Sequence, residues 1–279
     1  MVQEMVHPFT RYLREAMMPH IWCSGCGNGI VLNCFVQALD ELQKDLDQLV
    51  VVSGIGCIGR TAGYTNADSF HTTHGRAIAF ASGVKLANPE LEVVVISGDG
   101  DLFAIGGNHF IHAARRNIGI KVICANNFNY GMTGGQQGPT TPLEASTTTT
   151  PYGNIEHPFN LVHLAAASGA TYVARWTTLH VRRLTQSIKR MLQKEGFCFI
   201  EVVSHCPEIF GRRNKMRTGL DMMEWFRRAS VVENFSDPSK AEITPEKLVV
   251  GEFVNVEKVS YERLLHEKIA QINEKAMGW

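Results

Sequence analysis

The sequence lacks the features that mark membrane, secreted and nucleic-acid-binding proteins. Its 27 basic and 27 acidic residues leave a formal net charge of +0, so no charge excess favours nucleic acid. The longest apolar runs, such as residues 93–96, are far too short to cross a bilayer. The first residues include Glu4, Arg11 and Arg14 without an apolar stretch, which argues against a secretory signal. We therefore expect a cytoplasmic protein with no membrane partner and no nucleic-acid partner.

Cysteine is also scarce, with seven residues among 279. A low, odd number in a long chain argues against a secreted disulfide framework. Cys34, Cys124 and Cys198 lie inside apolar helix or strand patterns, and we expect them to be buried free thiols. The other four lie near turns or strand ends, beside glycine or proline: Cys23, Cys26, Cys57 and Cys206.

Four thiolates suit either a [4Fe–4S] cluster or a tetrahedral zinc ion. Zinc sites usually contain two close pairs, whereas only Cys23 and Cys26 have C-x-x-C spacing here. That spacing favours a cluster and leaves zinc as an alternative. A thioredoxin-like redox pair is a third interpretation, but it leaves Cys57 and Cys206 without a role.

Apolar, β-branched segments alternate with segments of helical periodicity along the chain. The predicted strands are residues 49–53, 93–97, 120–125, 170–174 and 197–203. The predicted helices are residues 28–45, 76–87, 108–115, 178–192, 221–228 and 261–274. This alternation predicts an α/β fold, an open and mostly parallel sheet with helices on both faces. We expect an α/β domain over residues 1–206 and a C-terminal helical extension, residues 207–279, that packs on this domain or on a partner subunit.

Two of the predicted strands end in residues that suit a phosphate and a hard cation. The first is followed by G-D-G-D from Gly98, and the next ends in Asn126-Asn127. Glycines let a backbone approach phosphate oxygens, and magnesium prefers carboxylate, carbonyl and phosphate oxygens. Ligands of open α/β sheets bind beyond the carboxyl ends of the strands, so the two segments are expected to meet there.

A third segment, residues 54–59, matches the G-x-G-x-x-G pattern of dinucleotide-binding proteins. Its context does not fit, because residues 60–66 are not expected to open a helix. No second strand ending in an acidic residue follows at the usual distance. A nicotinamide- or flavin-dependent dehydrogenase is therefore a minor alternative.

Taken in order, these segments resemble one enzyme family. The chain contains P-H-I-W-C-S-G-C-G-N-G from Pro19, G-I-G-C from Gly54, H-G-R from His74, G-D-G-D from Gly98 and N-N-F-N-Y-G-M-T-G-G-Q from Asn126. G-D-G followed by N-N resembles the thiamine diphosphate motif. The whole set resembles the β subunit of 2-oxoacid:ferredoxin oxidoreductases, especially the 2-oxoglutarate (2-oxoglutarate synthase) branch. The resemblance extends over nearly the whole chain, as far as Pro207.

The resemblance implies three cofactors: thiamine diphosphate, Mg²⁺ and a [4Fe–4S] cluster. Asp99, the Asn127 side chain and the Asn129 carbonyl would hold magnesium, and the implied cluster ligands are Cys23, Cys26, Cys57 and Cys206. His74 either contacts the cofactor as a catalytic residue or bonds to backbone at a helix start. The implied cofactor-binding residues are Ile55, Gly56, Cys57, Ile58, His74, Gly98, Asp99, Gly100, Asp101, Asn127, Asn129, Gly131 and Met132.

The implied reaction is the oxidative decarboxylation of a 2-oxoacid, with the thiazolium ring as electron sink. Coenzyme A takes the acyl group and ferredoxin the electrons, so 2-oxoglutarate would give succinyl-CoA. No residue is a clear candidate to activate the aminopyrimidine ring. In the family that glutamate belongs to an α subunit, and small γ and δ subunits are further possible partners.

Two positions depart from the family pattern. Ser24 stands where proline is common, and Gly134 stands where many two-subunit members have lysine. The second difference leaves branched-chain 2-oxoacids and pyruvate as alternative substrates. A cluster-free thiamine decarboxylase or synthase would have no use for four such cysteines. A zinc-stabilised scaffold protein would have no use for the G-D-G and N-N segments.

Overall fold

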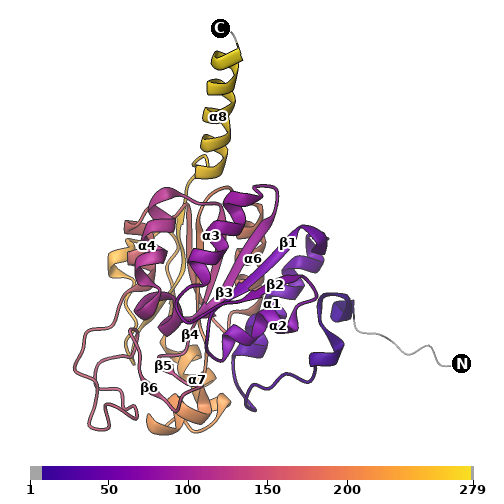
Figure 1. Cartoon of the computed structure of the whole chain (residues 1–279). Helices are drawn as coiled ribbons and strands as arrows, with labels where there is room; N and C mark the ends of the chain where they lie inside the picture. Colours follow the sequence, from indigo (N-terminus) through magenta and orange to yellow (C-terminus); the bar gives the residue numbers. More distant parts are fainter. Residues whose placement is uncertain (1–7, 278–279) are drawn as a thin grey trace, which may run out of the picture.

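The computed structural model describes residues 8–277, and its centre is an eight-stranded sheet in the order β2–β1–β3–β4–β8–β7–β10–β9 (Figure 1). All neighbouring strands are parallel except β7 and β10. The strands are β1 (Leu49–Ser53), β2 (Asp68–His71), β3 (Glu92–Gly98), β4 (Ile120–Asn126), β7 (Tyr172–Thr177), β8 (Cys198–Val203), β9 (Ser230–Val232) and β10 (Leu248–Asn255). The short strands β5 (Asn129–Tyr130) and β6 (Gln136–Gln137) form a separate antiparallel pair. The predicted mostly parallel sheet is confirmed.

Helices cover both faces of this sheet. They are α1 (Asn28–Glu41), α2 (Thr61–Tyr64), α3 (Ala77–Ala87), α4 (Gly107–Arg116), α5 (Leu161–Ala167), α6 (Val181–Gln193), α7 (Gly219–Ala229) and α8 (Tyr261–Met277). One apolar core joins α1, α6 and α7 to one face, and a second joins α3, α4 and α5 to the other. Successive side chains of a strand point to opposite faces, so Val94 packs in the first core and Val95 in the second.

The central strands are buried along their whole length and are largely apolar, because neither face meets water. Every residue of β1, β4, β7 and β8 is buried. Because these strands are parallel, their carboxyl ends lie at the same edge of the sheet. The polar segments that follow the strands are brought together there. The apolar segments of the sequence thus determine where the polar ones meet.

The C-terminal part differs from the predicted helical extension. Besides α7 and α8 it supplies β9 and β10, which extend the main sheet beyond β7. Helix α7 packs into the first core through Met222, Trp225 and Phe226. Helix α8 extends away from the body of the molecule (Figure 1). The division of the chain at residue 206 remains a prediction.

The segment after Gly59 begins a short helix. The expectation that no helix starts there is wrong, because α2 begins at Thr61, whose hydroxyl donates to the carbonyl of Ile58.

The N-terminal segment, for which we expect no secretory signal, includes residues 1–7, and these lie outside the described residues. Among residues 8–277, no helix is both long and apolar enough to span a membrane.

A fully buried ion pair joins β7 to β8. The Arg175 Nε donates to Glu201 Oε2 at 2.7 Å, and neither side chain is exposed to solvent. The remaining guanidinium nitrogens donate to the carbonyls of Ala241 and Val249 and to Asn160 Oδ1. Arg175 therefore connects the central sheet to β10 and to the start of α5.

Replacing Arg175 with alanine should destabilise the protein strongly. The substitution leaves the buried Glu201 charge without its partner, at a cost of about 3–5 kcal/mol. The matched control is Arg263→Ala, which removes an exposed ion pair with Glu195 and should cost less than about 1 kcal/mol. Urea unfolding followed by circular dichroism measures both free energies, and equal losses would contradict this account.

Candidate cofactor site

The residues predicted to hold the cofactor line one cavity at the carboxyl edge of the sheet. The cavity has a volume of about 80 Å³ and lies between the loops that follow β1, β2, β3 and β4. Its lining residues are Ile55, Gly56, Cys57, Ile58, His74, Gly98, Asp99, Gly100, Asp101, Asn127, Asn129, Tyr130, Gly131, Met132 and Thr133. Tyr130 and Thr133 are the members that the sequence did not single out.

Asp101 joins three of these loops through its buried carboxylate. Oδ1 accepts hydrogen bonds from the backbone N–H groups of Ile55 at 3.1 Å and Gly75 at 2.7 Å. The same oxygen lies 2.6 Å from His74 Nδ1, and Oδ2 accepts from the Ser97 hydroxyl at 2.8 Å. All four partners belong to the protein, so Asp101 organises the site from within. Its role in contacting the cofactor stays a prediction.

Gly54 permits this arrangement. A Cβ atom at this position would lie 1.9 Å from Asp101 Oδ2, far inside any permitted contact. Only glycine lets the loop after β1 approach the carboxylate this closely. The glycine-rich pattern that resembles a dinucleotide site therefore has a different local cause, which is the close approach of two loops.

His74 faces the cavity while its other side is held by Asp101. Because an ionised carboxylate only accepts, Nδ1 is the ring nitrogen that donates to it, and Nε2 takes no part in this bond. The side chain is about one-third exposed, and its ring meets the Tyr130 ring edge-on at 6.2 Å. The alternative in which this side chain bonds to backbone is not what the structure shows, because its Nδ1 bonds the Asp101 carboxylate.

The first aspartate of the G-D-G-D segment has a different environment. Asp99 is 2 % exposed, and burial raises its pKa to about 6 despite the hydrogen bond from Thr140, which lowers it. Asn129 lies on the same cavity, and its side-chain oxygen is buried without a hydrogen-bond partner. A buried carboxylate and an unpaired amide oxygen on one cavity form an oxygen-rich set that fits a hard cation.

Four cysteine thiols gather beside this cavity. Burial, with smaller contributions from the nearby thiols of Cys206, Cys57 and Cys23, raises the pKa of Cys26 to about 12. Burial likewise raises the pKa of Cys57 to about 11, with contributions from Cys206 and Cys23. Four sulfur donors from three separate segments therefore share one neighbourhood. Within the described part of the chain, no three Cys, His, Asp or Glu side chains form a group tight enough for a single metal ion.

Backbone contacts bring these cysteine segments together. The N–H of Gly27, next to Cys26, donates to the carbonyl of His205, next to Cys206, at 2.9 Å. The indole N–H of Trp22 donates to the Cys57 carbonyl at 2.6 Å. The remaining cysteines, Cys34, Cys124 and Cys198, are fully buried in the apolar cores, as predicted.

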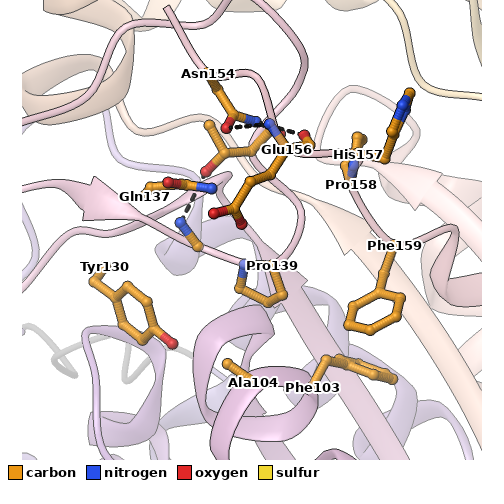
Figure 2. Close-up of a pocket in the computed structure, with 12 residues that line it drawn as sticks. Phe103, Ala104, Tyr130, Gln137, Pro139, Asn154, Glu156, His157, Pro158 and Phe159 are labelled. Carbon is orange, nitrogen blue, oxygen red and sulfur yellow. Dashed lines mark hydrogen bonds between the residues drawn. The ribbon is translucent and has the colours of Figure 1, made fainter. Parts of the chain in front are cut away.

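A larger cavity of about 550 Å³ adjoins the first and shares the Tyr130 ring with it. Figure 2 shows Tyr130 and Phe159 on opposite sides of this cavity, with the Glu156 side chain directed between them. Phe103 and Ala104 contribute from the π-helical segment Gly100–Ile105 that follows the G-D-G-D turn. The sequence did not indicate this cavity, because residues 137–159 have no periodic pattern.

A family model supports a cofactor role for this edge of the sheet. Residues 54–202 match the thiamine pyrophosphate enzyme family, C-terminal TPP binding domain. The match begins at the loop after β1 and ends within β8, so it includes every loop that lines the small cavity. The chain therefore contains a thiamine pyrophosphate-binding domain.

Two curated relatives are similar over most of the chain. The 2-oxoglutarate synthase subunit KorB of Methanocaldococcus jannaschii is 52 % identical over 97 % of this chain and 100 % of the relative. The KorB subunit of Archaeoglobus fulgidus is 55 % identical over 71 % of this chain and 74 % of the relative. Such identity across nearly the full length supports a common family and not only a common fold.

A solved structure agrees with these relatives. It is the 2-oxoglutarate:ferredoxin oxidoreductase from Magnetococcus marinus, described with 2-oxoglutarate, coenzyme A and succinyl-CoA bound. The similarity has a TM-score of 0.86 at 32 % identity, and it covers 98 % of this chain and 93 % of the solved one. The chain thus belongs to the family of KorB-type β subunits of 2-oxoacid:ferredoxin oxidoreductases.

Proposed function

We propose that this chain is the β subunit of an enzyme that oxidatively decarboxylates 2-oxoglutarate and forms succinyl-CoA. One 2-oxoglutarate and one coenzyme A give succinyl-CoA, carbon dioxide, one proton and two electrons, and two ferredoxins accept one electron each. The observation that carries the proposal is the loop after β1. Its residues Ile55 and Gly56 line the cofactor cavity, and the next residue, Cys57, belongs to the group of four thiols.

The proposed magnesium ligands are the Asp99 carboxylate, the Asn127 side chain and the Asn129 carbonyl. They are supported by the burial of Asp99 and by the unpaired Asn129 Oδ1, which adds a further oxygen donor to this side of the cavity. Magnesium would bridge these residues to the diphosphate of the cofactor. When bound, thiamine diphosphate supplies the electron sink for decarboxylation. The chain's own contribution is to hold the diphosphate end in a fixed position.

His74 is the proposed catalytic residue of this chain. Its Nε2 is available on the cavity side because Nδ1 is held by Asp101, so the ring can accept or hold a proton at that atom. The Asp101 contact also fixes the orientation of the ring. Asp101 also accepts a hydrogen bond from the N–H of Ile55, so it links His74 to the loop that carries Cys57.

The proposed [4Fe–4S] ligands are Cys23, Cys26, Cys57 and Cys206. Their mutual influence on thiol pKa supports a shared site, and four thiolates are the usual ligand set of such a cluster. A cluster beside the cofactor cavity would accept electrons one at a time. This arrangement suits ferredoxin as the next acceptor.

A partner subunit is needed to complete the site. Among residues 8–277, the acidic side chains that line the small cavity are Asp99 and Asp101. The first is the proposed metal ligand, and the second is engaged by four protein donors. We therefore assign the glutamate that activates the aminopyrimidine to an α subunit. Small γ and δ subunits are further proposed members of the complex.

The choice of 2-oxoglutarate is supported by the KorB relatives, and the loop around Gly134 distinguishes this chain from lysine-containing family members. Gly134 has a φ of 115°, a conformation that L side chains rarely adopt. A lysine at this position would be strained, so this loop differs from that of lysine-containing family members. Branched-chain 2-oxoacids and pyruvate are the competing substrates.

Metal and cofactor analysis tests the proposal as a whole. The complex purified without oxygen should contain iron and sulfide, show the visible absorbance of an iron–sulfur cluster, and bind thiamine diphosphate when magnesium is added. Zinc without iron would favour a scaffold role. Thiamine diphosphate binding without iron would favour a cluster-free decarboxylase.

Substitutions should separate the two cofactor sites. Asp99→Ala removes the proposed metal carboxylate, so thiamine diphosphate binding should fall by at least about tenfold while the cluster remains. Cys206→Ala should abolish the cluster and leave thiamine diphosphate binding. The matched control is Cys34→Ala, which removes a buried core thiol and should affect neither ligand. Loss of both ligands in both variants, with normal folding, would contradict two separate sites.

Substrate preference is tested in the full complex by viologen reduction with coenzyme A present. We expect kcat/KM for 2-oxoglutarate to exceed that for pyruvate and for a branched-chain 2-oxoacid by at least about tenfold, since a site built for a second carboxylate leaves its polar groups unpaired with apolar substrates. A branched-chain 2-oxoacid as the best substrate would overturn the proposed specificity while leaving the enzyme class intact.

A further inference from the structure

We propose that Thr140 is a positioning residue that holds the Asp99 carboxylate in the orientation required for the cation. The inference rests on the proposed role of Asp99 as a magnesium ligand. Thr140 lies in the loop that follows β6, 41 residues from Asp99 along the chain, and its side chain is buried. No motif in the sequence singles it out.

Thr140 contacts two site residues with one hydroxyl group. Its Oγ1 lies 2.5 Å from Asp99 Oδ2 and 2.8 Å from Asn126 Oδ1. A hydroxyl carries one hydrogen, so it donates to one of these oxygens at a time. The bond to an ionised carboxylate is the stronger of the two, because the charge assists it. Thr140 therefore restrains rotation of the Asp99 carboxylate about its side-chain bond.

Asn126, the first residue of the asparagine pair, is itself fixed from the far side. Its Nδ2 donates to Glu201 Oε1 at 2.7 Å, and a carboxylate only accepts. This contact turns Asn126 Oδ1 toward Thr140, where it also accepts from the N–H of Phe128 at 3.1 Å. The Arg175 guanidinium in turn holds Glu201. A continuous series of buried contacts thus connects Asp99, through Thr140 and Asn126, to the ion pair between β7 and β8.

The loop that carries Thr140 is anchored by hydrogen bonds of the neighbouring Thr141. The Thr141 hydroxyl donates to the Phe128 carbonyl at 2.6 Å and accepts from the N–H of Gly138 at 2.9 Å. These bonds keep Thr140 beside Asp99. Magnesium demands near-ideal octahedral geometry, so a carboxylate that is already oriented binds it at a lower cost. Loss of a residue that orients a metal ligand typically weakens metal binding by about 10–100-fold.

The test is the magnesium concentration that gives half-maximal binding of thiamine diphosphate to the full complex. The complex is first stripped of metal with a chelator, and bound thiamine diphosphate is then quantified by equilibrium dialysis. Thr140→Val keeps the size of the side chain and removes the hydroxyl, so it should raise this concentration at least about tenfold. Thr140→Ser keeps the hydroxyl and should stay within about twofold of the unmodified protein.

Thr171→Val is the matched control. Thr171 is also fully buried, and its hydroxyl donates to the carbonyls of Glu195 and Phe197 beside the amino end of β7, at the opposite edge of the sheet. The Thr171→Val substitution should lower the melting temperature of the protein without changing its magnesium requirement. Thr140→Ala provides a second test if the valine variant does not fold, and cluster absorbance checks the integrity of each variant.

The outcomes distinguish this inference from the function on which it rests. A raised magnesium requirement in Thr140→Val or Thr140→Ala, with a normal value in Thr140→Ser, supports the positioning role. A normal requirement in the valine variant, when Asp99→Ala abolishes binding, overturns the role of Thr140 and leaves the proposed function intact. Failure of the unmodified complex to bind thiamine diphosphate at any magnesium concentration overturns both. If Thr171→Val raised the magnesium requirement as much as Thr140→Val does, the cause would be general destabilisation, and the inference would be overturned.

Discussion

The carboxylate of Asp101 holds together the loops from which the site is built. It receives hydrogen bonds from Ile55 after β1, from His74 and Gly75 after β2, and from Ser97 in β3. A buried charge is costly unless it is paired and hydrogen-bonded, so the loops after β1 and β2 and the end of β3 converge on this carboxylate when the chain is folded. The cavity wall is therefore a consequence of satisfying one buried group.

This constraint couples the cofactor cavity to the group of four thiols through the backbone. The loop after β1 has its N–H group at Ile55 fixed by Asp101, and two residues later it presents Cys57 to the group of thiols. Trp22, one residue before the C-x-x-C segment, bonds the Cys57 carbonyl from the other side. A shift of this loop would therefore move a wall of the cofactor cavity and a thiol together. Such a short, doubly anchored connection suits a site in which electrons pass from one group to the next.

Much of this architecture was predictable from the sequence, for physical reasons. The buried strands β1, β3, β4 and β8 are continuous apolar runs, and the polar segments after them must meet at one edge of a parallel sheet. Strand β2 was missed because Asp68–His71 is largely exposed and carries no such pattern. Strand β10 was missed although Leu248–Val250 is apolar, since Gly251 and Glu252 interrupt the run. The partners of Asp99 and Asp101 could not be predicted, because they depend on loops that only the folded chain brings close.

The two aspartates of the G-D-G-D segment illustrate that limit. Asp99 and Asp101 are two residues apart and equally buried, at 2 % exposure each, so neither sequence position nor burial distinguishes them. Their hydrogen bonds do. Asp101 has donors from four residues, on the loops after β1 and β2 and in β3, whereas burial raises the pKa of Asp99 to about 6 although the Thr140 hydroxyl and nearby backbone N–H groups bond it. A carboxylate whose desolvation is only partly compensated gains most from a cation, because the cation supplies the missing charge. The environment of each carboxylate, and not the motif itself, separates the aspartate that joins the loops from the proposed metal ligand.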